Sequence, residues 1–277
     1  MIRRGKLMIF KKLIEIRRIF HRAISSLVPK FFKKLLLNSI LLTRFYQTII
    51  EIRWYLSPKK FYSQFGEDAV LLKLFDLYGF VSDKNNFYVD IGAGHPIRGS
   101  NTYFLYRLKL RGICIDANKF NIALHRFFRP RDISINAFVG QGKVVNFWEF
   151  NPYEYSTGDI ARAKQLVKGG VKLISKTKKE SVPLKAVIED HFDFNSRFIL
   201  LSIDTEGFDF EVLQTNDWDR YRPKFISVEN SEISKIQNYS TTFEINPIDH
   251  YLSTLGYKLI AKIHISEIWL DSKIKIS

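Results

Sequence analysis

Two stretches of the chain, each an apolar run that ends in an acidic residue and glycine, constrain the fold most. Residues 87–94 read FYVDIGAG, and residues 198–209 read FILLSIDTEGFD. Short apolar runs bounded by glycine are typical of strands buried on both faces, as in parallel sheets. Ligands of open α/β sheets bind at the carboxyl ends of such strands. We therefore expect the chemistry of this protein at the ends of these two strands.

The order of the predicted elements indicates an α/β fold. Strand-like and helix-like runs alternate, and the last two strands are joined by a very short turn. This predicts a mostly parallel sheet with helices on both faces, closed by an antiparallel hairpin. The expected strands are 87–91, 112–116, 133–138, 143–150, 198–203, 225–229, 257–264 and 267–271. The expected helices are 63–77, 100–110, 119–128, 183–192, 209–216 and 247–256. The polar, lysine-rich residues 151–181 are expected to form a long loop, either a functional lid or disordered.

The net charge of +15 is concentrated in the N-terminal part of the chain. Residues 1–60 contain 15 Lys or Arg against 2 acidic residues, whereas residues 61–277 hold 28 basic and 26 acidic residues. Apolar residues recur at three- and four-residue steps between residues 9 and 27, which predicts a basic amphipathic helix. We divide the chain into a helical arm, residues 1–58, and a globular domain, residues 59–277. The arm favours a membrane surface, while packing on the enzyme or on a partner subunit stays open.

Composition also bounds the location and the partners. The arm has no run of about 18 uncharged apolar residues, and it is a poor match to a signal peptide. We therefore expect a cytoplasmic protein, with peripheral contact of residues 1–56 at the inner face of an anionic membrane. The basic character belongs to the arm and not to the domain, which argues against nucleic acid as a partner. A single cysteine, Cys114, excludes an intramolecular disulfide, and a homo-oligomer is left open.

An acid–glycine turn followed by a distant acid predicts an adenosine-containing ligand. Asp90, Gly92 and Gly94 end the first strand, and Asp116 ends the second strand, 22 residues after Gly94. An acid at about this spacing can accept hydrogen bonds from both hydroxyls of a ribose. The turn departs from the dinucleotide fingerprint, because Ile97 stands where the third glycine belongs. An acid at the strand tip also suits a positively charged ligand better than a pyrophosphate.

Separated blocks of the chain read FYSQFGEDAVLLKLF, FYVDIGAGHPIRGSNTYFLY, GICIDAN, and SIDTEGFDFEVL with FISVEN. Together they resemble the FkbM family of class I S-adenosylmethionine-dependent O-methyltransferases, over roughly residues 61–271. The resemblance implies a Rossmann-like sheet of seven strands with an antiparallel last strand. It also implies the cofactor-binding residues Asp90, Gly92 and Gly94 at the methionine end, Asp116 at the ribose, Gln64 bordering the same pocket and Asn136 near the adenine.

Acidic residues after the strand at 198–203 predict acid–base chemistry. Methyl transfer to an alcohol requires the hydroxyl to lose a proton, which a positioned carboxylate or histidine can accept. Asp204 and Glu206 are the carboxylate candidates, and His95 in the glycine loop is the best-placed histidine. Asp209 is expected instead to cap the following helix.

The same acids allow a metal site as the alternative route. A divalent ion lowers the pKa of a bound oxygen ligand, and oxygen ligands favour magnesium. Asp204, together with Glu229 and Asn230 at the end of the next strand, resembles the magnesium site of catechol-type O-methyltransferases.

The sequence therefore predicts an S-adenosylmethionine-dependent O-methyltransferase, with magnesium as a second candidate cofactor. By analogy with the family that the chain resembles, the acceptor is expected to be a hydroxyl of a sugar or glycan intermediate. Two alternatives stay open. One is an NAD- or nucleotide-sugar-dependent oxidoreductase, and the other is a non-catalytic membrane adaptor on the same fold.

Overall fold

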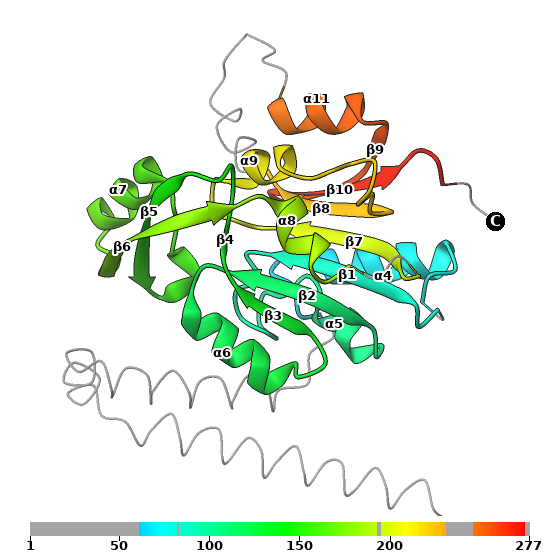
Figure 1. Ribbon diagram of the computed structural model, residues 1–277, viewed down its shortest axis with the longest axis horizontal. Coiled ribbons are helices and arrows are strands. Elements are labelled where there is room, and N and C mark those ends of the chain that lie inside the picture. Colours follow the sequence, from blue (N-terminus) through cyan, green and yellow to red (C-terminus); the bar gives the residue numbers. More distant parts are fainter. Residues whose placement is uncertain (1–60, 82, 193–194, 231–245, 275–277) are drawn as a thin grey trace, which may run out of the picture. The chain divides into compact units, whose positions relative to one another are not determined.

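The computed structural model describes residues 61–81, 83–192, 195–230 and 246–274, so the predicted arm lies outside the described residues. Seven strands form the main sheet: β1 (Asn86–Ile91), β2 (Arg111–Asp116), β3 (Ile133–Asn136), β7 (Arg197–Ile203), β8 (Phe225–Glu229), β9 (Tyr257–Ile263) and β10 (Ser266–Asp271). Their order is β3-β2-β1-β7-β8-β10-β9 (Figure 1). Every pair is parallel except those of β10, which runs antiparallel to both neighbours. The predicted Rossmann-like fold with an antiparallel last strand is confirmed.

Helices cover both faces of this sheet, because successive residues of each buried strand point to opposite sides. On β1, Tyr88 joins one apolar cluster and Val89 joins the other. Helices α4 (Glu67–Leu77) and α5 (Tyr103–Arg107) pack on the Tyr88 side. Helices α8 (Leu184–Glu189), α9 (Asp209–Gln214) and α11 (Pro247–Thr254) pack on the Val89 side. Helix α6 (Lys119–Phe128) lies against β2 and β3.

The strand order reverses between β1 and β7, and hydrogen bonds hold the strand ends together there. The backbone N–H groups of Gly92 and Ala93 donate to the carbonyl oxygen of Ile115, at 2.9 and 3.0 Å. The N–H of Asp204 donates to the carbonyl oxygen of Ile91 at 3.0 Å. The ends of β1, β2 and β7 therefore meet at the point where open α/β sheets bind their ligands.

The prediction of a long loop at 151–181 was wrong, because these residues supply two helices and the central strand of a second, smaller sheet. Its strands are β4 (Phe138–Val139), β5 (Val144–Asn151) and β6 (Lys172–Val182), in the order β4-β6-β5. The short helix η1 (Tyr153–Tyr155) and helix α7 (Ile160–Lys168) connect β5 to β6. Most of β6 is exposed, so its sequence lacks the alternation of apolar and polar residues by which a half-buried strand is recognised.

Candidate functional site

A cavity lies at the carboxyl ends of β1, β2 and β7. Its lining comes from the glycine turn after β1, the end of β2, residues 137–139, the second sheet with its connection, and the loop after β7. Gly92 has a φ of +71°, and a Cβ atom at this position would lie 1.8 Å from the carbonyl oxygen of Asp204. The turn after β1 and the end of β7 are thus in direct backbone contact, which only glycine permits.

Gly92→Ala is therefore expected to lower the unfolding free energy by about 2–4 kcal/mol. Overpacking costs about 1–3 kcal/mol, and the left-handed backbone adds about 1 kcal/mol. Gly142→Ala is the matched control, because Gly142 has a φ of +76° but no atom within 4 Å of its added Cβ. Chemical denaturation of both variants measures the difference. Equal losses would show that the contact with Asp204 carries no cost.

Asp116, which is 8% exposed, lies at the end of β2 and lines the cavity. Its carboxylate accepts the backbone N–H groups of Gly94 at 2.8 Å and Asn118 at 2.6 Å, and the side-chain amide of Asn121 at 3.0 Å. Burial raises the pKa of Asp116 to about 6, against the opposing effect of these hydrogen bonds. A carboxylate has about four acceptor sites, so about one site remains for a ligand hydroxyl. At neutral pH Asp116 presents a negative charge to the cavity.

Of two further predicted cofactor-binding residues, Gln64 is in the described cavity lining and Asn136 is not. The side-chain amide of Asn136 donates to the backbone carbonyl oxygens of Asp116 at 2.8 Å and Ala117 at 3.0 Å. Asn136 thus fixes the end of β2, and the residues that follow it, 137–139, line the cavity in its place.

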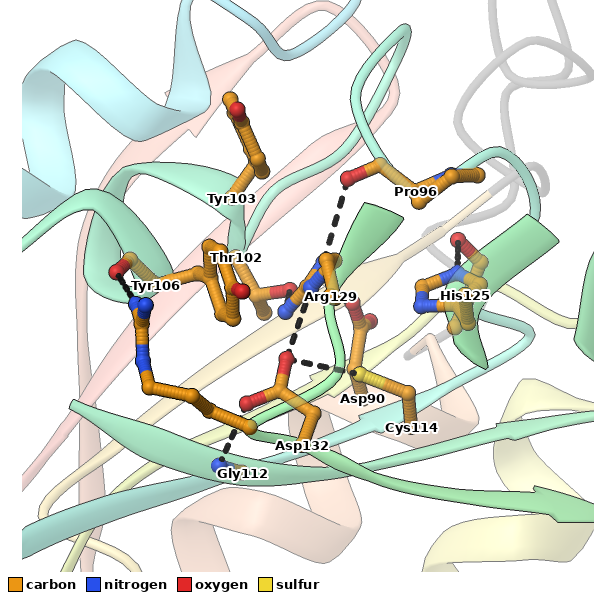
Figure 2. A network of polar contacts seen from close by, with 12 residues as sticks. Asp90, Pro96, Thr102, Tyr103, Tyr106, Gly112, Cys114, His125, Arg129 and Asp132 are labelled. Carbon is orange, nitrogen blue, oxygen red and sulfur yellow. Dashed lines mark hydrogen bonds and ion pairs between the residues drawn. The ribbon is translucent and has the colours of Figure 1, made fainter. Parts of the chain in front are cut away.

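Asp90 belongs to a buried polar network beside the glycine turn and is not part of the described cavity lining. Its carboxyl accepts the hydroxyl of Thr102 at 2.5 Å, and burial raises its pKa while Arg129 nearby opposes the shift. Arg129, which is 0% exposed, donates from Nε to Asp132 at 2.7 Å and from Nη1 to the carbonyl oxygen of Pro96 at 3.4 Å (Figure 2). Arg129 ties the turn to the strands, and no ligand-binding spacing in the sequence singles it out.

His95 lines the cavity, but its ring is held by the backbone of its own loop. Its Nδ1 accepts the N–H groups of Ile97 and Arg98, both at 2.9 Å. A neutral histidine has one acceptor nitrogen, and these two hydrogen bonds engage it. In this arrangement His95 orders the loop, and its acceptor nitrogen does not face a substrate proton.

Three carboxylates from two neighbouring strand ends meet beside the cavity, and two of them, Asp204 and Glu206, line it. One oxygen each of Asp204, Glu206 and Glu229 lies within 4.8 Å of the others. The pKa of Asp204 is raised well above its ordinary value, mainly by burial and further by repulsion from Glu229. The same two causes raise the pKa of Glu206 to about 7. Glu206 can therefore gain or lose a proton near neutral pH.

The metal-ligand set predicted from the sequence is only partly assembled. The side-chain oxygen of Asn230 accepts the amide of Asn246 at 2.7 Å, and the Asn230 amide donates to Asp249 at 3.4 Å. Asn230 therefore faces the start of α11 and not Asp204. Glu206 occupies the third position of the carboxylate group.

Asp209 was predicted to cap the helix that follows, and this was wrong. Phe208 is at the cap position of α9 and makes no side-chain cap. The carboxylate of Asp209 accepts the backbone N–H groups of Thr205 at 2.9 Å and Gly207 at 3.2 Å. It therefore orders the loop that carries Glu206, whose own backbone is left-handed with a φ of +54°.

The second sheet and its connection form the rest of the cavity wall, and the sequence did not single out Phe147 or Arg162 in this part of the chain. Phe147 and Tyr153 line the cavity with aromatic rings. Arg162 on α7 forms an ion pair with Glu206 at 3.3 Å, and the hydroxyl of Thr157 donates to the Glu206 carbonyl oxygen at 2.9 Å. The signal for α7 is its N-cap, Asp159, which accepts the N–H groups of the first helical turn.

A comparison with protein families gives one match. The model of the methyltransferase FkbM domain matches residues 90–259, more than half of the chain. These residues contain the glycine turn, the carboxylate group and the second sheet. No curated protein and no solved structure matches the chain. Among the described residues, no helix has the length and apolar character needed to cross a membrane.

Proposed function

Because the chain belongs to the FkbM methyltransferase family, we propose that it methylates a hydroxyl of a sugar or glycan intermediate with S-adenosylmethionine as the donor. The observation that carries this proposal is the group of Asp204, Glu206 and Glu229, of which Asp204 and Glu206 line the same cavity as the glycine turn. When bound, S-adenosylmethionine supplies an electrophilic methyl group on a positively charged sulfur. The residues of this chain must hold that donor, orient the acceptor and take up its proton.

The cavity has the chemistry that this donor requires. One arginine, Arg98, is in the described lining. The acids of the lining are Asp116, Glu154, Asp204 and Glu206. Glu154 pairs with Arg98, so the ionised Asp116 supplies negative charge that favours a sulfonium and an ammonium group. Asp116 would accept a hydrogen bond from a ribose hydroxyl. The glycines of the turn have no side chains, so the donor could approach the backbone there closely. The apolar residues 137–139 would contact the adenine.

We assign the proton transfer to Glu206. A general base works best when its pKa lies near the working pH, and the pKa of Glu206 is about 7. Burial and Glu229 also raise the pKa of Asp204 well above its usual range. With donor and acceptor bound, Glu206 would take up the proton that the acceptor hydroxyl loses. Arg162, at 3.3 Å, orients the Glu206 carboxylate.

A neutral acceptor rich in hydroxyls fits this cavity better than a phosphorylated one. Carboxylates accept hydrogen bonds from hydroxyl groups, whereas they repel a phosphate at close range. The rings of Phe147 and Tyr153 offer apolar surface to the faces of a sugar. The same acids disfavour a pyrophosphate cofactor, so the oxidoreductase alternative loses support beside the family match. A non-catalytic adaptor remains the second candidate, and it predicts donor binding without turnover or no binding at all.

Calorimetric titration tests the donor. We expect saturable binding of S-adenosylmethionine and S-adenosylhomocysteine, and a loss of about 10- to 150-fold in affinity for Asp116→Ala, because a hydrogen bond to a charged group is worth about 1.5–3 kcal/mol. Asp76→Ala removes an exposed acid of α4 and is the control. Absence of binding by folded wild-type protein would overturn the proposal. The same titration with magnesium chloride tests the proposed cation, whose carboxylate ligands would be Asp204, Glu206 and Glu229.

A further inference from the structure

The unit formed by β5, α7 and β6 carries the basic charge of the globular domain. Residues 141–182 contain eight Lys or Arg and four Asp or Glu, whereas the rest of residues 61–277 contains 20 basic and 22 acidic residues. Several aliphatic side chains of this unit are also exposed. We name its outer part the β6–α7 surface, defined by Ile160, Lys164, Val167 and Lys168 on α7 and Lys172, Leu173, Ile174 and Lys176 on β6.

The outer side of α7 mixes aliphatic and basic residues. Ile160 and Val167 are 54% and 52% exposed. Lys164 and Lys168 are exposed on the same side of the helix, because their spacing from Ile160 is four and eight residues. Helix α7 packs through Ala163 and Leu166 on Trp148 and Phe150 of β5, and neither Ile160 nor Val167 belongs to this cluster. The exposed aliphatic side chains are thus not needed for the core.

The adjoining part of β6 repeats this combination. Leu173 and Ile174 are 42% and 49% exposed, between the exposed Lys172 and Lys176. Lys176 pairs with Trp148 across the ladder and lies 5.3 Å from its ring centroid, so it is on the sheet face that α7 covers. Leu173 pairs with Phe150, which also packs against α7, so Lys176 and Leu173 share the α7 side of the sheet. Lys172 begins β6 four residues after α7 ends at Lys168, so the two elements adjoin there.

We propose that the β6–α7 surface docks on an anionic lipid surface. Lysines attract anionic headgroups, and aliphatic side chains between them enter the boundary between headgroups and acyl chains. A second copy of the chain is a poorer occupant of this surface, because it would place the lysines of the two copies against each other. A nucleic acid is also a poorer occupant, because its phosphates would make no favourable contact with the aliphatic side chains. The defined surface has no aromatic ring on which a base could stack. The proposal is independent of methyl transfer, and it adds a second contact to the one expected of the arm at residues 1–56.

Site-specific fluorescence in the full-length chain separates this surface from the arm. An environment-sensitive dye is attached at Val167→Cys or Ile174→Cys, and the native Cys114 is buried and protected. Vesicles of phosphatidylcholine with phosphatidylserine are expected to blue-shift and strengthen the emission at both positions. Vesicles of phosphatidylcholine alone are expected to leave it unchanged. The dye at Leu77→Cys, an exposed position on α4, is the control and is expected not to respond.

Charge reversal supplies the second test. We expect a fourfold charge reversal to abolish the fluorescence change of the dye at position 167. The four substitutions are Lys164→Glu, Lys168→Glu, Lys172→Glu and Lys176→Glu. The control reverses four exposed lysines elsewhere: Lys73, Lys109, Lys185 and Lys258. No response at 167 and 174 in labelled chains without the charge reversals would overturn the proposal. If those chains still sediment with the vesicles, another part of the chain binds the membrane. An equal response to phosphatidylcholine alone would also overturn it.

Discussion

Replacement of Glu206 by glutamine is expected to lower kcat/KM for a hydroxyl acceptor by about 100- to 10,000-fold, the usual contribution of a general base. Glutamine has nearly the same shape and can still accept a hydrogen bond from Arg162, which donates to Glu206 at 3.3 Å. It cannot take up the proton that the acceptor hydroxyl loses. A methyl-transfer assay measures the effect, and Glu189→Gln, at an exposed acid paired with Arg220, is the control.

The pH dependence distinguishes a base from a residue that only positions the acceptor. The wild-type kcat/KM is expected to rise with pH through about 7, because that is where Glu206 loses its proton. Glu206→Gln is expected to lose this step and to keep the lower one near pH 6, where Asp116 ionises. A variant that is slower but still rises through pH 7 would assign the base to another group.

As pH rises towards 7, the unfolding free energy is expected to fall while the activity rises. The folded-state pKa of Glu206 lies at about 7, above the ordinary 4.5, so the native state binds the proton more tightly than the unfolded chain. The unfolding free energy therefore falls as pH rises from about 4.5 to 7. Glu206→Gln removes this loss, and at pH 8 the variant should be at least as stable as the wild type. Loss of activity together with loss of folding would leave the assignment of Glu206 without support.

The main sheet could be predicted from the sequence because its strands carry an unambiguous signal. β1 and β7 are apolar runs that end in an acid and glycine, and their burial on both faces follows from that pattern. β6 has the opposite character, since it is lysine-rich and held mainly by backbone pairing with β5. An exposed strand that is held by backbone pairing has no regular pattern of apolar residues by which the sequence could identify it.

The site was predictable to the extent that strand ends converge. Asp116, Asp204 and Glu206 line one cavity because their strands are neighbours or next neighbours in the sheet. The direction of a side chain after a strand depends on its packing partners, which a sequence does not identify. Asp90 therefore turned into the buried network with Arg129.

The second large effect is expected from Arg129→Met, which should lower the unfolding free energy by about 3–5 kcal/mol, the cost of breaking a buried ion pair from one side. Methionine fills a similar volume but leaves Asp132 as a buried acid without its hydrogen bond from Nε. It also removes the guanidinium that opposes the raised pKa of Asp90. Arg126→Met, at an exposed position of α6, is the control and should change the unfolding free energy by less than about 0.5 kcal/mol.

A double-mutant cycle separates lost charge compensation from lost packing. Asp132 also accepts the hydroxyl of Tyr88 and the backbone N–H of Gly112, at 2.8 and 3.0 Å, and asparagine can keep an oxygen toward these donors. If Arg129→Met acts by stranding a charge, then Asp132→Asn in the same chain should recover part of the loss, with a coupling energy of about 1–3 kcal/mol. Denaturation curves of the two single variants and the double variant measure this coupling. Strictly additive losses would mean that Arg129 stabilises the glycine turn by its packing and by its contact with Pro96, and not by neutralising Asp132.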